Sequence, residues 1–279
     1  MAKILIAGCG KLGSQLGVQL QQQGHQVWGI RRDISKLPEQ IHPIAADMHR
    51  PLPELSEQFD YVLYMASAGK YKDSAYYQAY VQGTRNLVKA LAAQTQLKHL
   101  FFVSSTSVFS QTDGEMVNES SPAEPHGFSS ERILEGEQTI SQSELPATIV
   151  RFGGIYGPGR THLIDLVLQG KAHCMEDVWS NRIHSEDCIG ILMHLITMVE
   201  NGQALDELYI GVDDQPTLSC EVYEWLAEQL SVSEVDHREP SENSRLMRSN
   251  KRLSNQRIRA TGYEFIYPTY QDGYQDLLP

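Results

Sequence analysis

The chain has 279 residues, of which 41% are hydrophobic, 8% aromatic and 21% charged. These proportions are typical of a globular protein and exclude collagen-like, low-complexity and largely disordered chains. The 35 acidic and 23 basic side chains give a formal net charge of -12 at pH 7. Because an acidic surface repels phosphate groups, we expect neither a nucleic-acid partner nor binding to an anionic membrane.

The sequence contains no targeting or metal-binding pattern. Its apolar stretches are far shorter than the roughly 20 residues of a transmembrane helix, and its first residues lead into a glycine turn rather than a secretory signal. We therefore expect a cytoplasmic protein with no membrane partner. The four cysteines form no C-x-x-C pair: Cys9, Cys174, Cys188 and Cys220. This spacing predicts reduced thiols, with no disulfide framework and no zinc or other metal site.

The first half of the chain alternates between strand-like and helix-like segments. Strands are expected at Lys3–Ala7, Gln26–Ile30, Tyr61–Met65, His99–Ser104 and Ala147–Phe152, and helices at Leu12–Gln22, Ser74–Ala92 and Ser129–Ser141. Such alternation indicates βαβ units and a parallel sheet with helices on both faces. The sequence thus predicts an α/β protein with a doubly wound Rossmann fold.

The second half is less regular. Gly153–Arg160 is expected to be a loop, Leu208–Gly211 a strand, and Glu186–Glu200 and Glu221–Leu230 helices. These elements supply too few strands for a second large sheet, so we expect a small C-terminal α/β lobe that binds substrate. The predicted boundaries are 1–152 for the NAD(P)-binding Rossmann domain, with 180–211 returning to it, and 153–179 plus 212–279 for the substrate lobe.

A G-x-G-x-x-G motif follows the first predicted strand and opens the first helix, and it consists of Gly8, Gly10 and Gly13 with Lys11 and Leu12. The first glycine permits a tight turn, the second lets the backbone approach a pyrophosphate, and the third lets helix and strand pack closely. The helix N-terminus adds N–H donors for an anion. We expect these five residues to bind a dinucleotide; the alternative is a tight turn without a ligand.

The residues after the second predicted strand bear on the choice of dinucleotide. An NAD site usually has an acidic residue about 20 positions after the motif, where it accepts hydrogen bonds from the ribose hydroxyls. Here Arg31 and Arg32 come first and Asp33 follows them. A pair of guanidinium groups suits the 2′-phosphate of NADP. We expect NADP, with NAD as the alternative if Asp33 turns toward the ribose.

Further motifs stand where this fold would present them to a dinucleotide. They are Ala46-Asp47-Met48, Met65-Ala66-Ser67, Val103–Phe109, Arg151–Gly159, Arg182–Asp187 and Leu208–Gly211. Together they resemble the extended short-chain dehydrogenases/reductases, also called the NAD-dependent epimerase/dehydratase family, over nearly the whole chain. The resemblance implies that Asp47 and Met48 contact the adenine and that Ala66 and Ser67 line the cofactor.

The same resemblance breaks down at the catalytic residues. The family uses Tyr-x-x-x-Lys on one helical face, where the tyrosine transfers a proton while the nicotinamide exchanges hydride, and a serine on the fifth strand binds the substrate oxygen. Alignment on Pro125 puts Phe128 at the tyrosine position and Arg132 at the lysine position, and it retains the serine as Ser105. The chain resembles the atypical subgroup that lacks the usual pair, with Arg132 still able to bond the cofactor's ribose.

Several side chains are candidates for the substrate site. The resemblance suggests Tyr156 as a replacement acid, with packing beneath its loop as the favoured alternative. Tyr71 follows the fourth strand beside two lysines and is a candidate for an anionic substrate, with a solvated loop as the alternative. Arg160 and Arg182 resemble positions that hold a nucleotide-sugar diphosphate, although Arg182 could instead pair with Glu186 or Asp187. His184 is read as a substrate-facing or structural histidine.

Two functions are compatible with these residues. The first is an NAD(P)-dependent oxidoreductase or epimerase with an atypical active site, acting on a nucleotide sugar or a similar polar metabolite. The second is a catalytically inactive NADP(H)-binding sensor. The resemblance further implies a homodimer through the helices near 74–92 and 129–141.

Overall fold

The computed structural model describes residues 1–174, 177–232, 235 and 249–279. The chain divides into two compact units. Unit 1 comprises Met1–Val108, Pro125–Arg151 and Leu192–Tyr209, and unit 2 comprises Phe109–Glu124, Phe152–Ile191 and Ile210–Pro279. Within the described ranges, no helix is long and apolar enough to cross a membrane.

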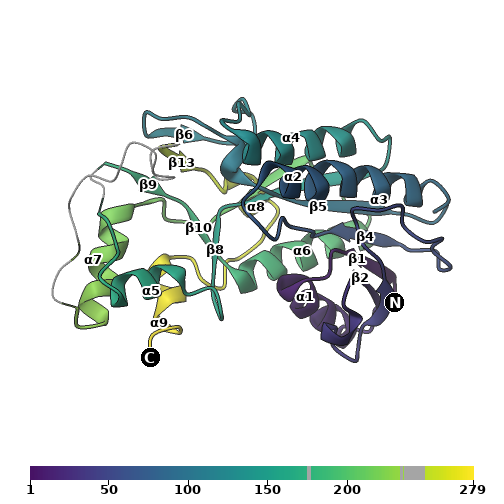
Figure 1. The fold of residues 1–279 in the computed structure, drawn as a ribbon, viewed down its shortest axis with the longest axis horizontal. Coiled ribbons are helices and arrows are strands. Elements are labelled where there is room, and N and C mark those ends of the chain that lie inside the picture. The colour runs from purple at the N-terminus through teal and green to yellow at the C-terminus, as the bar shows by residue number, and fades with distance from the viewer. Residues whose placement is uncertain (175–176, 233–234, 236–248) are drawn as a thin grey trace. The chain divides into compact units, whose positions relative to one another are not determined.

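Unit 1 is built around a seven-stranded sheet with the order β11-β7-β5-β4-β1-β2-β3 (Figure 1). Its strands are β1 (Lys3–Ala7), β2 (Gln26–Arg31), β3 (His42–Ala45), β4 (Tyr61–Tyr64), β5 (His99–Ser105), β7 (Ala147–Phe152) and β11 (Leu208–Gly211). β1 pairs in parallel with both β2 and β4, β2 with β3, and β4 with β5. The expected doubly wound α/β fold is therefore confirmed, and the strand order reverses between β1 and β4.

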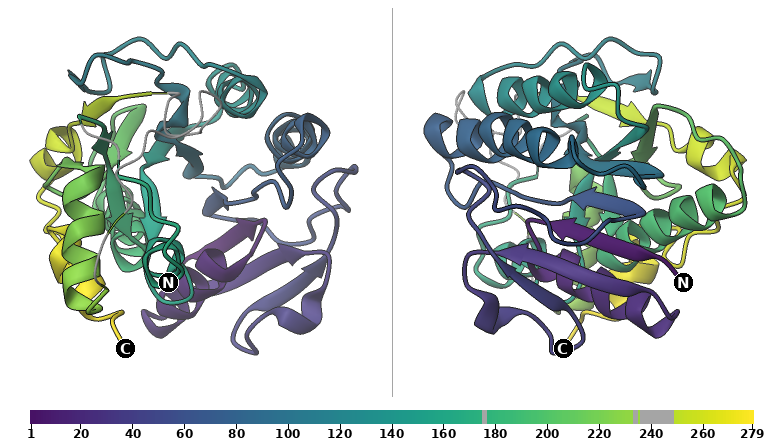
Figure 2. Two further views of the ribbon diagram at one scale, coloured as in Figure 1. Left: turned by 60° about the vertical axis from the view of Figure 1, so that its left-hand side comes forward. Right: turned by 90° about the vertical axis from the view of Figure 1, so that its right-hand side faces the viewer.

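Helices cover both faces of this sheet. They are α1 (Lys11–Gln22), α2 (Asp73–Tyr76), α3 (Gly83–Leu91), α4 (Phe128–Ser141) and the last part of α6 (Ser185–Glu200), with short turns η1 (Ile34–Lys36), η2 (Tyr77–Gln82) and η3 (Thr106–Val108). Figure 1 shows α2, α3 and α4 over one face and α1 over the other, and Figure 2 shows α3 and α4 side by side. The core between sheet and helices includes Leu5, Val62, Leu87, Phe102 and Ile140.

Two details of unit 1 differ from the sequence expectation. β3 was not predicted because Pro43 interrupts its pattern; a proline is tolerated there because β3 lies at the end of the strand order. The single helix expected at Ser74–Ala92 is divided by the π-helical turn η2. The hydroxyls of Tyr64 and Thr84 donate to the carbonyls of Ala79 and Tyr80 in this turn.

The described residues of unit 2 form three two-stranded sheets and a small helical core. The strands are β6 (Glu115–Val117), β8 (Gly154–Tyr156), β9 (Trp179–Ser180), β10 (Arg182–His184), β12 (Thr217–Leu218) and β13 (Lys251–Leu253), and the helices are α5 (His162–Leu168), α7 (Ser219–Gln229), α8 (Gln256–Ala260) and α9 (Tyr270–Gln275). The core joins aliphatic side chains of α5 and α7 to Tyr156, Tyr270 and Tyr274. The expected loop at Gly153–Arg160 thus contains a strand, β8, which pairs with β10.

The division into units differs from the sequence-based boundaries in two longer segments, apart from residues 152 and 210–211 at strand ends. Residues 109–124 and 180–191 belong to unit 2, whereas the sequence pattern places them in the first domain. The pairing of the short strands explains the difference: β6 pairs with β13, and β10 pairs with β8. Strands of two or three residues carry too little periodicity to be recognised in a sequence.

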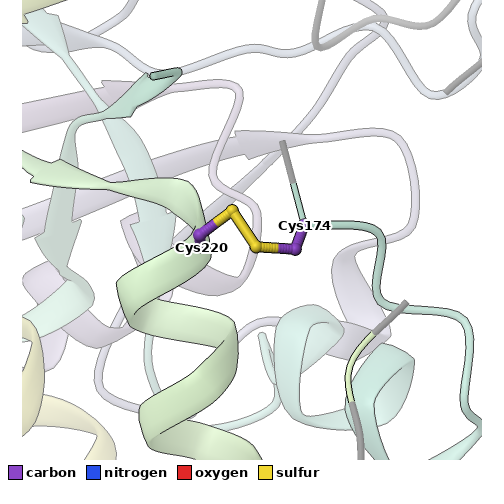
Figure 3. Close-up of a disulfide and its surroundings, with 2 residues drawn as sticks. All are labelled: Cys174 and Cys220. Atoms are coloured by element: carbon purple, nitrogen blue, oxygen red, sulfur yellow. A yellow bond between two sulfur atoms is a disulfide. The ribbon is translucent and has the colours of Figure 1, made fainter. Parts of the chain in front are cut away.

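The cysteines of unit 2 correct one expectation. Cys174 and Cys220 form a disulfide, with their Cα atoms 4.6 Å apart, although no disulfide was predicted (Figure 3). The two residues are 46 positions apart in the sequence, but the segment before residue 175 meets the first turn of α7. Sequence spacing alone did not show this approach. Cys9 and Cys188 are free thiols and are buried.

Candidate functional site

A pocket of about 300 Å³ lies in unit 1 at the carboxyl ends of β1, β2, β3 and β4. Four chain segments line it, one after each of these strands: Gly8–Gly10, Ile30–Asp33 with Lys36, Ala46–His49 and Met65–Ser67. It therefore occupies the place where the strand order reverses, which is the usual ligand crevice of an open parallel sheet.

The turn after β1 shows why glycines are needed. Gly8 has a φ of +80°, and a Cβ there would lie 2.5 Å from the backbone of Ala66. A Cβ on Gly10 would meet only the carbonyl oxygen of Gly8, at 3.9 Å, so this position borders open space. A Cβ on Gly13 would lie 3.0 Å from the side chain of Ile6, so this glycine lets α1 pack on β1. Each of the three positions therefore favours glycine for a different structural reason.

The other two residues of the motif lie at the start of α1 and face different ways. The side chain of Lys11 is exposed, and that of Leu12 is buried in unit 1. Neither lines the pocket through its side chain, which leaves the N-terminus of α1 as the polar group that the motif offers to an anion.

The end of β2 separates the roles of its charged residues. Arg31 donates from Nη1 to the carbonyls of Cys9 and Lys36, both at 3.3 Å, so its guanidinium joins two segments of the pocket wall. Asp33 caps η1: its carboxylate accepts from the hydroxyl of Ser35 at 2.6 Å and pairs with Lys36 at 3.1 Å. These contacts lower the pKa of Asp33.

Arg32 differs from both of its neighbours. Its side chain is exposed and lines the pocket, and it makes no hydrogen bond or ion pair with any residue that the structure describes. A guanidinium in this position is available to an anionic group on a ligand.

The ends of β3 and β4 form the remaining wall. Asp47 accepts from the backbone N–H of His49 at 3.1 Å, and the buried Met48 is held through its carbonyl, which accepts from Asn86 at 2.8 Å. Ala66 and Ser67 follow β4, with Ala66 against Gly8. The predicted residues Asp47, Met48, Ala66 and Ser67 are therefore brought together with the glycine turn.

Lys36 and His49 also line this pocket, although neither belongs to one of the sequence motifs. The sequence feature that could have indicated Lys36 as a pocket residue is its position three residues after Asp33, with which it pairs. His49 directly follows the predicted Asp47-Met48 pair and lies 3.5 Å from the Asp47 carboxylate. Both are basic groups that become pocket residues only because their loops fold back at the sheet edge.

The residues aligned with the family's catalytic group lie elsewhere in unit 1. Ser105 ends β5, and its hydroxyl accepts from the N–H of Ser107 at 3.2 Å. Phe128 begins α4, with its ring 4.9 Å from that of Tyr71. Arg132 pairs with Asp73 at 2.8 Å and with Glu135 one turn further along α4, and these contacts raise its pKa. Its charge is therefore already compensated by two carboxylates.

In unit 2, Tyr156 packs against protein on all sides. It is 3% exposed, its ring stacks on Tyr274 at 4.3 Å, and its hydroxyl donates to the carbonyl of Thr269 at 3.5 Å. Burial raises its pKa far above the ordinary tyrosine value. This environment is that of a packing residue, and it does not favour proton transfer near neutral pH.

The remaining substrate candidates of unit 2 differ in exposure. Arg182 and His184 are 5% and 1% exposed, whereas Arg160 is exposed. His184 Nδ1 accepts from the N–H of Glu186 at 3.3 Å, and burial lowers its pKa to about 4. Asp187 accepts hydrogen bonds from Tyr263 and from the backbone at Ile266 and Tyr267. Of the three candidates, only Arg160 presents its side chain to solvent.

Comparison with known proteins identifies relatives of the chain. Residues 4–211 match the family described as "NAD dependent epimerase/dehydratase family". A structure from Methylobacillus flagellatus, provisionally described as an NAD-dependent epimerase/dehydratase, shares 36% identity and a TM-score of 0.84, over 99% of this chain and 97% of that one.

Two other comparisons are more distant. Protein YeeZ of Escherichia coli K12 is 28% identical over 213 residues, which are 72% of this chain and 76% of YeeZ. The UDP-glucuronic acid 4-epimerase of Bacillus cereus, solved in complex with NAD, shares 18% identity and a TM-score of 0.79, over 97% of this chain and 95% of that one. At this identity the second likeness shows the fold alone.

Proposed function

The chain belongs to the NAD dependent epimerase/dehydratase family, and on this basis we propose that it is an oxidoreductase whose unit 1 pocket binds NADP(H). Gly8, Gly10, Leu12 and Gly13 shape the turn, the N-terminus of α1 at Lys11 faces the pyrophosphate, and Asp47 and Met48 lie at the adenine. Arg31 and Arg32 serve the 2′-phosphate, Ala66 and Ser67 line the dinucleotide, and Arg132 is not required for it.

The contrast between Arg32 and Asp33 carries the preference for NADP. An NAD site needs a carboxylate that accepts from the ribose hydroxyls. Asp33 is occupied by Ser35 and Lys36, while the exposed Arg32 lines the pocket and can form charge-assisted hydrogen bonds to a 2′-phosphate. Arg31 contributes its charge from within the pocket wall.

Replacement of Arg32 by alanine is expected to weaken NADPH binding by about 10–100-fold and to leave NADH binding unchanged, because a charge-assisted hydrogen bond contributes about 1.5–3 kcal/mol. Arg31→Ala should weaken the binding of both NADPH and NADH, since it removes the hydrogen bonds that link the turn after β1 to η1. Calorimetric titration measures all four affinities. Arg85→Ala, an exposed arginine on α3, is the control. Tighter binding of NADH than NADPH by the unchanged protein would refute the preference.

The glycine turn gives a second test. Gly10→Ala is expected to weaken dinucleotide binding by about 10–100-fold, because the new methyl group separates the backbone from the pyrophosphate. The melting temperature without cofactor should stay the same, since a Cβ there meets only one atom at 3.9 Å. Gly8→Ala, with its positive φ and backbone clash, should lower that melting temperature. Full affinity in Gly10→Ala would show that the pyrophosphate lies elsewhere.

The substrate assigned by this proposal is a small polar metabolite in the class of nucleotide sugars. The name of the Bacillus cereus enzyme supports this class, as does the exposed Arg160 of unit 2, which suits a diphosphate. Ser105 would bind the substrate oxygen; Arg182, His184 and Tyr156 would shape unit 2 from within. The proposal includes a substrate role for residues 153–179 and 212–279, a cytoplasmic location and a homodimer. Because Phe128 lacks a hydroxyl, turnover of such substrates is expected to be slow.

A further inference from the structure

Four aromatic rings of unit 1 form a contiguous group, the aromatic cluster, made of Tyr71, Tyr76, Tyr80 and Phe128. Tyr71 contacts Phe128 with ring centroids 4.9 Å apart and Tyr76 at 5.9 Å. Tyr76 in turn contacts Phe128 at 5.7 Å and stacks on Tyr80 at 5.7 Å. The cluster is not closed off from solvent, because Tyr71 is 43% exposed.

The cluster belongs to the same edge of the sheet as the pocket. Tyr71 lies in the loop after β4, four residues beyond the pocket residue Ser67. Phe128 begins α4, the helix that follows β5. In a parallel sheet, the helix after each strand starts at the carboxyl edge, where ligands bind. The cluster therefore continues the ligand-binding edge beyond the part that the pocket occupies.

The charges around the cluster do not suit reduction of an isolated, unconjugated carbonyl. Reduction of such a carbonyl creates a localised alkoxide, which needs a proton donor, and Phe128 cannot supply one. Arg132 cannot serve as a free cation either, since Asp73 and Glu135 already pair with it. By contrast, Lys70 and Lys72 are exposed on both sides of Tyr71 and suit an anionic group.

From these observations we propose that the aromatic cluster binds a planar, conjugated hydride acceptor, an isoalloxazine or a quinone, and that the bound NADPH reduces it. The inference rests on the proposed function. The C4–H bond of NADPH breaks, and its hydride forms a new bond to the acceptor ring, at N5 of an isoalloxazine. NADPH is oxidised to NADP⁺, the acceptor gains two electrons, and water supplies the remaining proton. The negative charge spreads over the ring, so no side chain has to donate a proton.

The test uses the full chain saturated with NADPH, with FMN or menadione as the acceptor. The reaction is monitored without oxygen by the decrease in NADPH absorbance. Both acceptors should be reduced faster than in free solution. Tyr71→Ala should raise the KM for FMN about tenfold, as expected for a lost stacking partner, and leave the NADPH dissociation constant unchanged. The matched control is Tyr77→Ala, since Tyr77 is 37% exposed on the same segment but packs against Arg132. That control should keep the KM.

Further measurements separate this inference from the proposed function. Quenching of FMN fluorescence by the protein without a nicotinamide tests the ring site alone, and Tyr71→Ala should raise the FMN concentration needed for half-maximal quenching about tenfold. Tight NADPH binding with no acceptor reduction above the background would overturn the inference and leave the proposed function intact. Equal losses of FMN reduction in Tyr71→Ala and Tyr77→Ala would also overturn the inference. If the unchanged protein quenches FMN fluorescence but does not bind NADPH, the proposed function and its hydride step would be overturned.

Discussion

Replacement of Glu137 by glutamine is expected to lower the free energy of unfolding by about 3–5 kcal/mol, because it removes one charge of a buried, hydrogen-bonded ion pair. The Glu137 carboxylate accepts from Arg151 Nε at 2.9 Å and Nη2 at 2.6 Å, and the two side chains are 3% and 7% exposed. The hydroxyl of Ser104 donates to the same carboxylate. Urea denaturation monitored by circular dichroism measures the loss.

An exposed ion pair on the same helix provides the control. Glu135→Gln removes one partner of Arg132, whose side chain is 28% exposed, and should cost at most about 1 kcal/mol. The double change Glu137→Leu with Arg151→Met removes both buried charges together and should recover much of the stability lost in Glu137→Gln. Equal losses in Glu137→Gln and Glu135→Gln would show that burial does not determine the strength of the first pair.

This buried pair also holds together the elements that carry Ser105 and Phe128. Ser104 is next to Ser105 at the end of β5, Glu137 lies on α4, and Arg151 lies on β7. The pair therefore fixes the strand that ends with Ser105 against the helix that begins with Phe128. In Glu137→Gln we expect the dinucleotide affinity to change little, since the pocket is lined by residues that follow β1 to β4.

The sequence predicted the parts of the fold that follow from long regular patterns. β1 and α1 were predicted within one residue at each end because a buried run is followed by glycines and then by leucines four apart. β3 was missed because Pro43 interrupts its short strand pattern, and β8 and β10 were missed because three residues show no period. The disulfide of Cys174 and Cys220 depends on a tertiary approach that no local pattern reports.

The candidate site shows the same distinction. The glycine motif correctly indicated the turn after β1. A side chain at Gly8 or Gly13 would collide with a neighbouring residue, and a side chain at Gly10 would occupy the open space beside the turn. The sequence could not decide between Arg32 and Asp33, because the decision depends on the cap that Asp33 makes for η1. It also could not show that Asp73, far from Arg132 in the sequence, pairs with it. The sequence can predict a turn that depends on adjacent residues, whereas the partner of a charged side chain depends on how distant segments fold together.

The double change Phe128→Tyr with Arg132→Lys is expected to raise single-turnover hydride transfer to keto-sugar nucleotides by about 10²–10⁴-fold, the usual contribution of a general acid. It restores the family's proton donor and its cation on the helix that packs beside β5. Because Asp73 and Glu135 hold the side chain at position 132, the variant should be made with and without Asp73→Asn. The variant with Asp73→Asn should show the larger gain, since its new lysine is less strongly held away from the tyrosine.

Tyr156→Phe in the otherwise unchanged protein is the comparison for this experiment. The Tyr156 hydroxyl already donates to Thr269 and is buried, so its removal should leave the rate of hydride transfer unchanged. NADPH absorbance is followed for all variants against one panel of nucleotide sugars. A large loss in Tyr156→Phe, with no gain in the double variant, would identify Tyr156 as the proton donor. Rapid turnover by the unchanged protein that neither change affects would place the reacting atoms away from both Phe128 and Tyr156.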